Sequence, residues 1–280
     1  MTTTTHKKRS PAKMAIFAIG AVISIAYVMP FFMVFVNSFK PKFEILANPL
    51  SLPVTFTWDN FSQALQKMNF FVSLTNSVIV TVFSVSGLIL LSSMLAYYLS
   101  RTPNKFTKSV FLILVASMIV PFQALMIPFS GLFAPLVEGR NLLMLIFFYQ
   151  GFGVALSTFL YHGFISNIPK ELDEAASIDG ASDFTIFWRI IFPMLRPITA
   201  TVAIINALWI WNDYLLPALV LNQENQSQTL PLSTYLFYGQ YSTEYGQAMA
   251  GLLLAVLPII IFYLILQRQF ISGISQGAVK

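Results

Sequence analysis

The chain has 280 residues, of which 56% are hydrophobic and only 10% charged, with a formal net charge of +5 at pH 7. Together with a mean hydropathy of +0.72, this composition excludes a soluble domain, because no globular fold of this length hides so much apolar surface. The absence of cysteine excludes disulfides, thiolate metal sites and a cysteine nucleophile. We therefore expect an all-α membrane protein.

The first apolar run, Ala15 to Val36, is expected to remain as a membrane helix. It is too long for a cleaved signal peptide, and it carries Pro30, Phe31 and Phe32 where a small-residue cleavage site would be needed. The segment 1–14 before it is basic, which places the N-terminus in the cytoplasm by the positive-inside rule.

Six apolar runs are long enough to cross a hydrocarbon core, which requires about 20 residues of helix. The predicted spans are Ala15 to Val36, Val72 to Leu99, Val110 to Pro128, Leu142 to Ile165, Ile198 to Leu221 and Ala248 to Leu266. A transmembrane domain over 15–271 and a cytoplasmic tail over 272–280 follow from these spans. With six crossings, both termini are expected in the cytoplasm.

The distribution of basic residues supports this orientation. Of the 16 Lys and Arg residues, only Lys40, Lys42, Lys67 and Arg140 fall on the predicted outer side. The excess of positive charge lies at membrane-flanking positions, where anionic lipid headgroups attract it, so membrane lipid explains it without nucleic acid. Arg101, in a short inner loop, is interpreted as a topological anchor.

Two segments leave alternatives open outside the membrane. The stretches Asn37 to Phe71 and Asn222 to Gln247 contain Trp or Tyr among prolines and polar residues, and these aromatic rings either form the interfacial belt or stack on a sugar. The second span has a small polar face that begins at Asn76 and Ser77, and it either lines an aqueous path or tightens helix packing.

A polar interval from Asn167 to Arg196 interrupts the apolar pattern between the fourth and fifth spans. Pro169 and the following acids favour the start of a helix. Gly180 ends that helix, Ser182 can cap a second one, and Pro193 is expected to stop it. The first helix presents small residues that allow another body to approach closely, and the second presents an aromatic face, from Phe184 to Ile191, toward the membrane helices.

The same interval carries a recognisable motif. Glu174-Ala175-Ala176 is followed after three residues by Gly180, after nine more by Ile190, and after one more by Phe192-Pro193. This spacing resembles the EAA loop of ABC-importer permeases, EAA-x3-G-x9-I-x-L-P, with Phe192 in the place of Leu. The stretches Trp211 to Pro217 and Leu266 to Lys280 are similar to the shorter, six-helix subunit of the carbohydrate (maltose/oligosaccharide-type) branch.

This resemblance implies the type I ABC-importer permease fold, with a cytoplasmic coupling-helix loop over 167–196. It implies a permease that moves a sugar or oligosaccharide across a bacterial cytoplasmic membrane, with a second and non-identical permease subunit, two cytoplasmic ATPase subunits and an external sugar-binding protein as partners. The chain has no GxxxxGK[ST] phosphate loop, so ATP hydrolysis would belong to the partners and the chain would be neither an enzyme nor a cofactor carrier. The implied ATPase-coupling residues are Glu174, Ala175, Ala176, Gly180 and Pro193.

Asp213 is the one ionisable residue well inside a predicted span. A carboxylate at that depth is costly unless it is paired or faces water, so Trp211, Asn212, Asp213 and Tyr214 are expected either to shape the translocation path or its gate, or to fix one helix against another. A secondary transporter or channel with Asp213 as coupling site is the alternative function, although no internal repeat supports it. His162 lacks the ligand spacing of a metal site.

The last residues, Gly273 to Lys280, have too little apolar content to fold alone. The residues by themselves favour a frayed terminus. The resemblance to the oligosaccharide branch instead implies an extended tail that is ordered in the assembled transporter and contacts both ATPase subunits.

Overall fold

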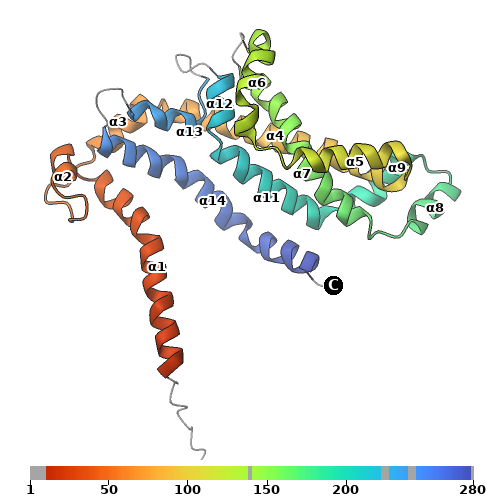
Figure 1. Ribbon diagram of the computed structural model, residues 1–280, viewed down its shortest axis with the longest axis horizontal. Coiled ribbons are helices and arrows are strands. Elements are labelled where there is room, and N and C mark those ends of the chain that lie inside the picture. The colour runs from red at the N-terminus through yellow and green to blue at the C-terminus, as the bar shows by residue number, and fades with distance from the viewer. Residues whose placement is uncertain (1–10, 138–140, 222–226, 239–243, 279–280) are drawn as a thin grey trace, which may run out of the picture. The chain divides into compact units, whose positions relative to one another are not determined.

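The computed structural model describes residues 11–137, 141–221, 227–238 and 244–278 (Figure 1). The described residues form helices and connecting turns without a strand, which confirms the predicted all-α fold. The chain divides into two compact units, one of residues 1–67 and 236–254, the other of residues 68–235 and 255–280.

The first unit contains α1, α2, α3 and the beginning of α14. Their bounds are α1 Pro11–Ser38, α2 Lys42–Ala47, α3 Asp59–Lys67 and α14 Tyr245–Ala278. The turn after α1 is built around the buried ring of Phe39, which stacks on Phe56 with ring centroids 4.8 Å apart and meets Trp58 edge-on at 5.0 Å. These rings fold part of the predicted outer segment into a compact cluster.

Polar contacts complete this first unit. The Asn60 side-chain amide donates to the Ser38 and Lys40 carbonyls at 2.9 and 2.8 Å. Gly246 lies against the same amide, and a Cβ there would approach Asn60 to 2.6 Å, so the close approach requires glycine. The Glu44 carboxylate accepts hydrogen bonds from the Val54 and Thr55 amides at 3.0 and 2.8 Å.

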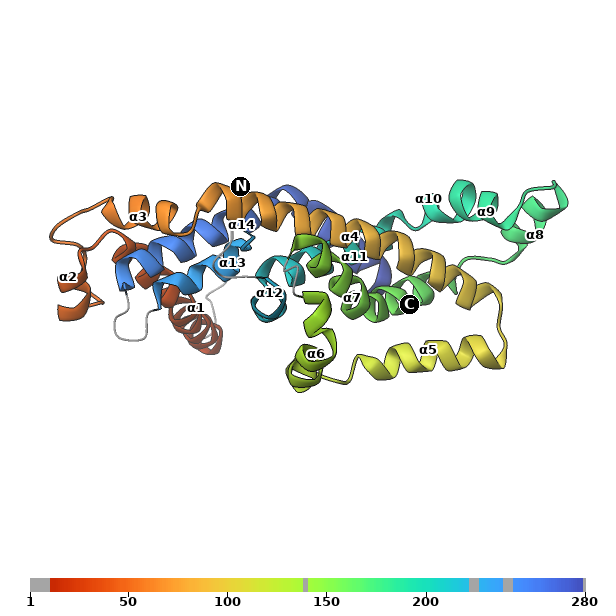
Figure 2. The same cartoon turned by 90° about the horizontal axis from the view of Figure 1, so that it is seen from above.

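The second unit holds most of the helices. They are α4 Phe70–Arg101, α5 Lys105–Ser117, α6 Phe122–Val137, α7 Leu142–Ile165, α8 Glu171–Ile178, α9 Asp183–Ile186, the π-helical turn η1 Phe187–Ile191, α10 Phe192–Met194, α11 Arg196–Asn212, α12 Leu215–Val220 and α13 Leu230–Ser233. The 3-10 turn η2, Thr234–Phe237, follows α13. Long helix α4 packs along α7 and α11 (Figure 2).

The described residues contain four helices that are long and apolar enough to cross a membrane, or six if each of two bent helix pairs counts as one span. The larger number equals that of the predicted crossings, although one of these pairs begins with α9 and α10, which precede the predicted fifth span. One bent pair joins α5 to the start of α6 at 105°, and the other joins α9–α10 to α11 at 76°.

Two predicted spans have different internal structure from the expected straight helix. Val110 to Pro128 is divided between α5 and α6, because Pro121 lacks an N–H donor and disfavours helix at the residue before it. Ile198 to Leu221 is interrupted at Asp213, whose φ of −72° and ψ of 134° are those of extended backbone. Apolar composition predicted the total length of each run but not the bend within it.

The predicted extended tail is also wrong, because α14 remains helical to Ala278. Low apolar content does not prevent helix in this segment, because it continues a helix that is already nucleated. Each residue added to such a helix gains one backbone hydrogen bond without a new nucleation cost.

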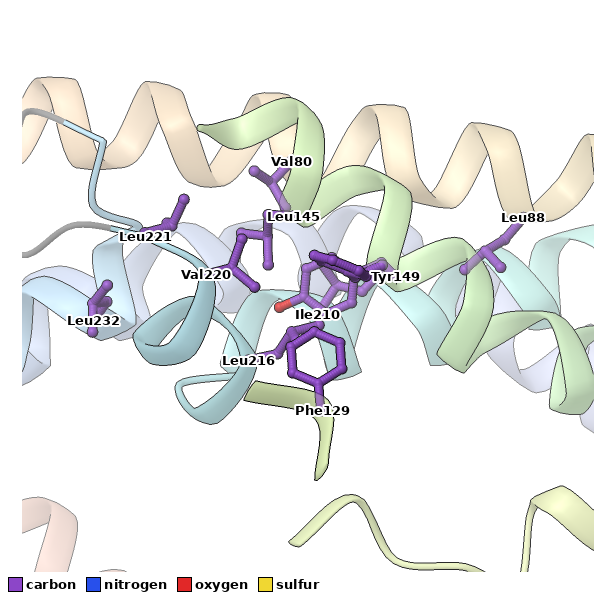
Figure 3. Packing of buried hydrophobic residues seen from close by; sticks show 11 residues of the cluster. Val80, Leu88, Phe129, Leu145, Tyr149, Ile210, Leu216, Val220, Leu221 and Leu232 are labelled. Carbon is purple, nitrogen blue, oxygen red and sulfur yellow. The ribbon is translucent and has the colours of Figure 1, made fainter. Parts of the chain in front are cut away.

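The core of the second unit lies where α4, α7 and the α11–α12 break meet. Tyr149 of α7 lies among Ile210, Leu216 and Phe129 (Figure 3). Glycine allows the helices to come close, since a Cβ at Gly153 would meet the Leu88 side chain at 2.6 Å. The whole core cluster consists of Val80, Leu88, Phe129, Leu145, Phe148, Tyr149, Ile210, Leu216, Val220, Leu221 and Leu232.

The polar face of the second span is buried in this unit. Ser77 Oγ accepts a hydrogen bond from the Leu230 amide at 2.7 Å, and the Asn76 amide donates to the Gln228 carbonyl at 3.0 Å. Ser84, Ser92 and Ser93 are buried as well, whereas Ser86 is exposed. These contacts favour the packing interpretation of the polar face.

Candidate coupling segment and the helix break at Asp213

The first candidate site is the coupling segment, residues 167–196, and α8 is its first helix. Helix α8 begins after Lys170, two residues later than the predicted start at Pro169, and its first turn contains Glu171, Asp173 and Glu174. These carboxylates lie at the positive end of the helix. Helix α8 buries none of its residues against the rest of the second unit.

Gly180 ends α8 in the way that the sequence predicted. Its φ is +84°, a left-handed conformation that L side chains rarely adopt. The Gly180 amide donates to the Ser177 carbonyl, and the Ala181 amide to the Ala176 carbonyl, each at 3.0 Å. This pair of hydrogen bonds is a Schellman motif, in which glycine closes the helix and turns the chain.

The second helix starts at its predicted cap, because the Ser182 hydroxyl accepts a hydrogen bond from the Thr185 amide. It does not stop at Pro193, however. The helix forms the π turn η1, in which the Phe192 amide donates to the Phe187 carbonyl five residues earlier. It then continues as α10 to Met194. A proline excludes a regular hydrogen bond and crowds the carbonyl four residues earlier, and a π turn accommodates both effects.

The predicted aromatic face of this second helix is largely confirmed. Phe187 and Ile191 are buried, and Trp188 packs against the same cluster together with Tyr161 of α7 and Val202 of α11. Phe184 is the exception, because its ring is 67% exposed. The helix is therefore anchored on the membrane helices through its C-terminal half.

The predicted ATPase-coupling residues lie mostly on open surface. Glu174, Ala175, Gly180 and Pro193 are exposed, whereas Ala176 packs against the buried cluster below. Apolar Ile178 is 86% exposed, next to these residues in sequence. A large exposed apolar side chain on a helix with no buried residue is typical of a surface that another protein covers.

Asp173, one of the acids expected to favour the helix start, has specific partners in the structure. The Tyr97 hydroxyl donates to Asp173 Oδ1 at 2.8 Å, and the Arg101 guanidinium forms an ion pair with Asp173 Oδ2 at 2.8 Å. Arg101 also donates to the Ile168 carbonyl at 3.2 Å. The interpretation of Arg101 as a plain topological anchor is therefore incomplete.

These three side chains border a cleft of about 540 Å³ between the end of α4 and helices α8 and α9. Its lining also includes Lys170, Glu174 and Phe184. The cleft thus combines both signs of charge with an exposed aromatic ring, beside the predicted coupling residues.

The second candidate site is the helix break at Asp213. Asp213 Oδ1 accepts a hydrogen bond from the Leu215 amide at 3.0 Å, which satisfies a free donor at the start of α12. Tyr149 of α7 is fully buried, and its hydroxyl donates to Asp213 Oδ2 at 2.9 Å. The carboxylate therefore ties α7 to the break between α11 and α12, as the structural alternative for Asp213 expects.

The neighbours of Asp213 point in different directions. Trp211 is buried, and its indole N–H donates to the Ala255 carbonyl at 3.4 Å. Asn212 is exposed and its amide donates to the Leu208 carbonyl of its own helix. Tyr214 stacks on Tyr235 with ring centroids 3.6 Å apart. Of the four predicted path residues, Asn212 alone is exposed.

No group of three or more metal-ligating side chains occurs among the residues that the structure describes. His162 packs its ring against Phe111, with centroids 4.2 Å apart.

The amino-acid sequence is similar to those of known transport proteins over nearly the whole chain. Residues 88–276 match the family model described as binding-protein-dependent transport system inner membrane component. The chain is 44% identical, over 94% of its length and 95% of the relative's, to the probable starch degradation products transport system permease protein AmyC of Thermoanaerobacterium thermosulfurigenes. It is 37% identical to the melibiose/raffinose/stachyose import permease protein MelC of Bacillus subtilis, with 97% and 98% of the two chains covered.

A solved structure shows the same fold. A chain of a bacterial ABC transporter involved in the import of the acidic polysaccharide alginate superposes with a TM-score of 0.76 at 20% identity, covering 96% of this chain and 99% of the other. The family match, the relatives and the helical fold agree. The chain therefore belongs to the binding-protein-dependent transport system inner membrane components, the multi-pass permeases of ABC importers.

Proposed function

We propose that the chain is the permease subunit of an ATP-driven importer of a sugar or oligosaccharide, and that its coupling segment docks on a cytoplasmic ATPase subunit. The full-length similarity to permeases for starch degradation products and for melibiose, raffinose and stachyose supports the substrate class. The partners would be two ATPase subunits, an external sugar-binding protein and a second, paralogous permease subunit. The Lys and Arg distribution supports cytoplasmic termini.

The exposed face of the coupling segment is the observation that carries the docking proposal. Ile178 is 86% exposed and α8 buries no residue of its own. Full burial of one isoleucine side chain in a partner groove contributes about 2 kcal/mol. The small side chain of exposed Ala175 and the absence of one at Gly180 let a partner approach the α8 backbone closely.

The alternative of a secondary transporter with Asp213 as coupling site loses its basis. Asp213 has a buried tyrosine hydroxyl and a backbone amide as partners. The chain also belongs to a family of ABC-importer permeases. In this proposal, nucleotide-driven motion of the ATPase subunits switches the permease between outward and inward access.

Substitution of Gly180 tests the docking proposal. Gly180→Leu places a bulky side chain on the docking face, and we expect sugar uptake and co-purification of the ATPase subunit to fall at least about tenfold, a loss of 1.4 kcal/mol or more. Membrane content of the permease should stay unchanged. The measurement is uptake in reconstituted vesicles together with pull-down of the ATPase subunit.

Two controls separate bulk from backbone strain. Gly180→Asn keeps a residue that tolerates the left-handed conformation, so it should retain most of the activity. Gly163→Leu adds the same bulk near the end of α7, where no neighbouring atom lies within 4 Å of the added Cβ. Normal transport and a normal complex with Gly180→Leu would show that the docking assignment is wrong.

A further inference from the structure

Helix α8 is joined to the membrane helices by one shielded polar cluster, which we name the Asp173 clasp: Tyr97, Arg101 and Asp173. Of the α8 side chains, Asp173 alone forms a hydrogen bond or ion pair with another described helix. Asp173 Oδ1 accepts a hydrogen bond from the Tyr97 hydroxyl at 2.8 Å, and Oδ2 lies 2.8 Å from the Arg101 guanidinium in an ion pair that lacks hydrogen-bond geometry. The clasp therefore joins α8 to the cytoplasmic end of α4.

The clasp is protected from solvent, unlike an ordinary surface ion pair. The Arg101 and Asp173 side chains are only 12% and 15% exposed. Exposed pairs contribute little because water screens them, whereas a shielded pair with additional hydrogen bonds becomes costly to break. Arg101 has a further acceptor in the Ile168 carbonyl, so it holds the linker from α7 as well as α8.

The covalent connections of α8 are less suited to transmit a displacement. Toward α7, the chain runs through the non-helical residues 166–170. Toward α9, it turns at Gly180 in a left-handed conformation. Neither connection continues a helix, so a movement of α8 could be absorbed at both ends without the clasp.

Helix α4 is well placed to receive such a movement. Its 32 residues pack along α7 and α11, and its buried positions run from Ser73 near one end to Leu99 near the other (Figure 2). Packed helices move as bodies, because their interdigitated side chains allow little internal deformation. A displacement applied at Arg101 would therefore reach the core around Leu88 and Tyr149.

We infer that the Asp173 clasp is the mechanical link through which displacement of α8 is transmitted to α4. Tyr97, Arg101 and Asp173 act as positioning residues for transport and contact neither ATP nor sugar. This inference rests on the proposed function, because it takes the ATPase subunit as the source of the displacement. It adds the route by which motion enters the permease.

The test uses the complete transporter, reconstituted with its binding protein and ATPase subunits in proteoliposomes. Asp173→Asn keeps the size of the side chain and removes its charge. We expect sugar uptake to fall about tenfold while ATP hydrolysis stays within about twofold, so that the ATP consumed per sugar rises about tenfold, which is a typical coupling magnitude. ATPase co-purification should remain normal. Glu171→Gln, in the same first turn of α8 and without a partner on α4, is the matched control and should leave the ratio unchanged.

Two further variants separate a link from general stability. Tyr97→Phe removes one hydroxyl and should give a smaller rise in ATP per sugar, because the ion pair remains. Arg101→Gln combined with Asp173→Asn should be no worse than the more damaging single change, because both act on one link. Additive losses in the double variant, or an unchanged ATP per sugar with Asp173→Asn, would overturn the inference.

The outcome also distinguishes this inference from the proposed function. If Asp173→Asn releases the ATPase subunit as Gly180→Leu does, Asp173 belongs to the docking face and the clasp is not the link, while the proposed function stands. If Gly180→Leu leaves docking and transport intact, the proposed docking itself fails.

Discussion

At the scale of single residues, the sequence pattern around a position predicted the helix ends and caps that depend on neighbouring residues. Gly180 and Ser182 have the roles that their neighbours in sequence indicated, a left-handed helix end and a helix cap. The partners of Asp173 and Asp213 could not be predicted, because Tyr97 and Tyr149 lie 76 and 64 residues away in the chain. Nothing in a single sequence specifies which distant hydroxyl meets which carboxylate. The one available signal was that Arg101 and the acids of 171–174 fall on the same predicted side of the membrane.

Glu44 in the first unit allows a pH prediction. Desolvation alone would raise the pKa of the Glu44 carboxyl, but the amide donors of Val54 and Thr55, with Lys40 nearby, outweigh it and lower this pKa below its ordinary value of 4.5. A lowered folded-state pKa stabilises the contact above the unfolded pKa, and this stabilisation is lost as the pH falls through the folded value.

We therefore expect amide hydrogen exchange at Val54 and Thr55 to remain protected at pH 5 and above, about half a unit over the ordinary Glu pKa. Below the lowered pKa of Glu44, this protection should be lost. Exchange measured by mass spectrometry across this pH range, corrected for intrinsic rates, checks the expectation. In Glu44→Gln the pH dependence should disappear, and protection of both amides that persists unchanged in strong acid would contradict the assigned cause.

At the scale of elements, hydrophobic runs predicted how many spans to expect but not where they bend. Pro121 lies inside the third run, and the local effect of proline indicated a break that the length criterion overlooked. The break at Asp213 has no comparable local signal, since it is held by Tyr149 from α7 and by the Leu215 amide. Tertiary contact sets that boundary.

The contact between Tyr149 and Asp213 predicts linked losses across the elements that it joins. Asp213→Leu removes the acceptor from a buried hydroxyl, so we expect about 2 kcal/mol lower stability and reduced sugar uptake. Tyr149→Phe should cost about 1 kcal/mol, and the double variant should lose less than the sum of the two. Thermal unfolding in detergent and vesicle uptake provide the measurements.

Tyr27→Phe is the control for Tyr149→Phe, since it removes a hydroxyl from an exposed tyrosine of α1. It should leave stability unchanged. Better expression of Asp213→Leu with unaltered uptake would mean that Asp213 faces lipid and that both interpretations of it are wrong.

At the scale of the whole molecule, composition and the spacing of one motif are enough to indicate the family, without knowledge of any contact. Residues 88–276, the region that the family model matches, include both candidate sites. Whole-chain properties such as hydropathy depend on sums over many residues, so they are visible in sequence. The Asp173 clasp depends on three side chains meeting, so it is not.

The C-terminal tail gives a prediction for the assembled transporter. Helix α14 extends to Ala278, so in the proposed transporter Gly273 to Ala278 would meet the ATPase subunits as a helix end. Deletion of Ser275 to Lys280 should lower sugar-stimulated ATP hydrolysis while the permease remains in the membrane. Hydrolysis and import by the truncated complex at the full-length rate would show that the tail is dispensable.

The π turn η1 determines the direction in which α9 faces. A π turn holds about one residue more than an α turn, so removal of one residue from Phe187–Ile191 would restore a continuous α-helix from α9 into α10. Helix α9, Asp183–Ile186, which runs directly into η1, would then rotate by about 100° around its axis relative to α10. Ile186 would leave its buried position among the membrane helices although its side chain had not changed. The single extra residue in η1 thus keeps the apolar side of α9 turned toward that cluster.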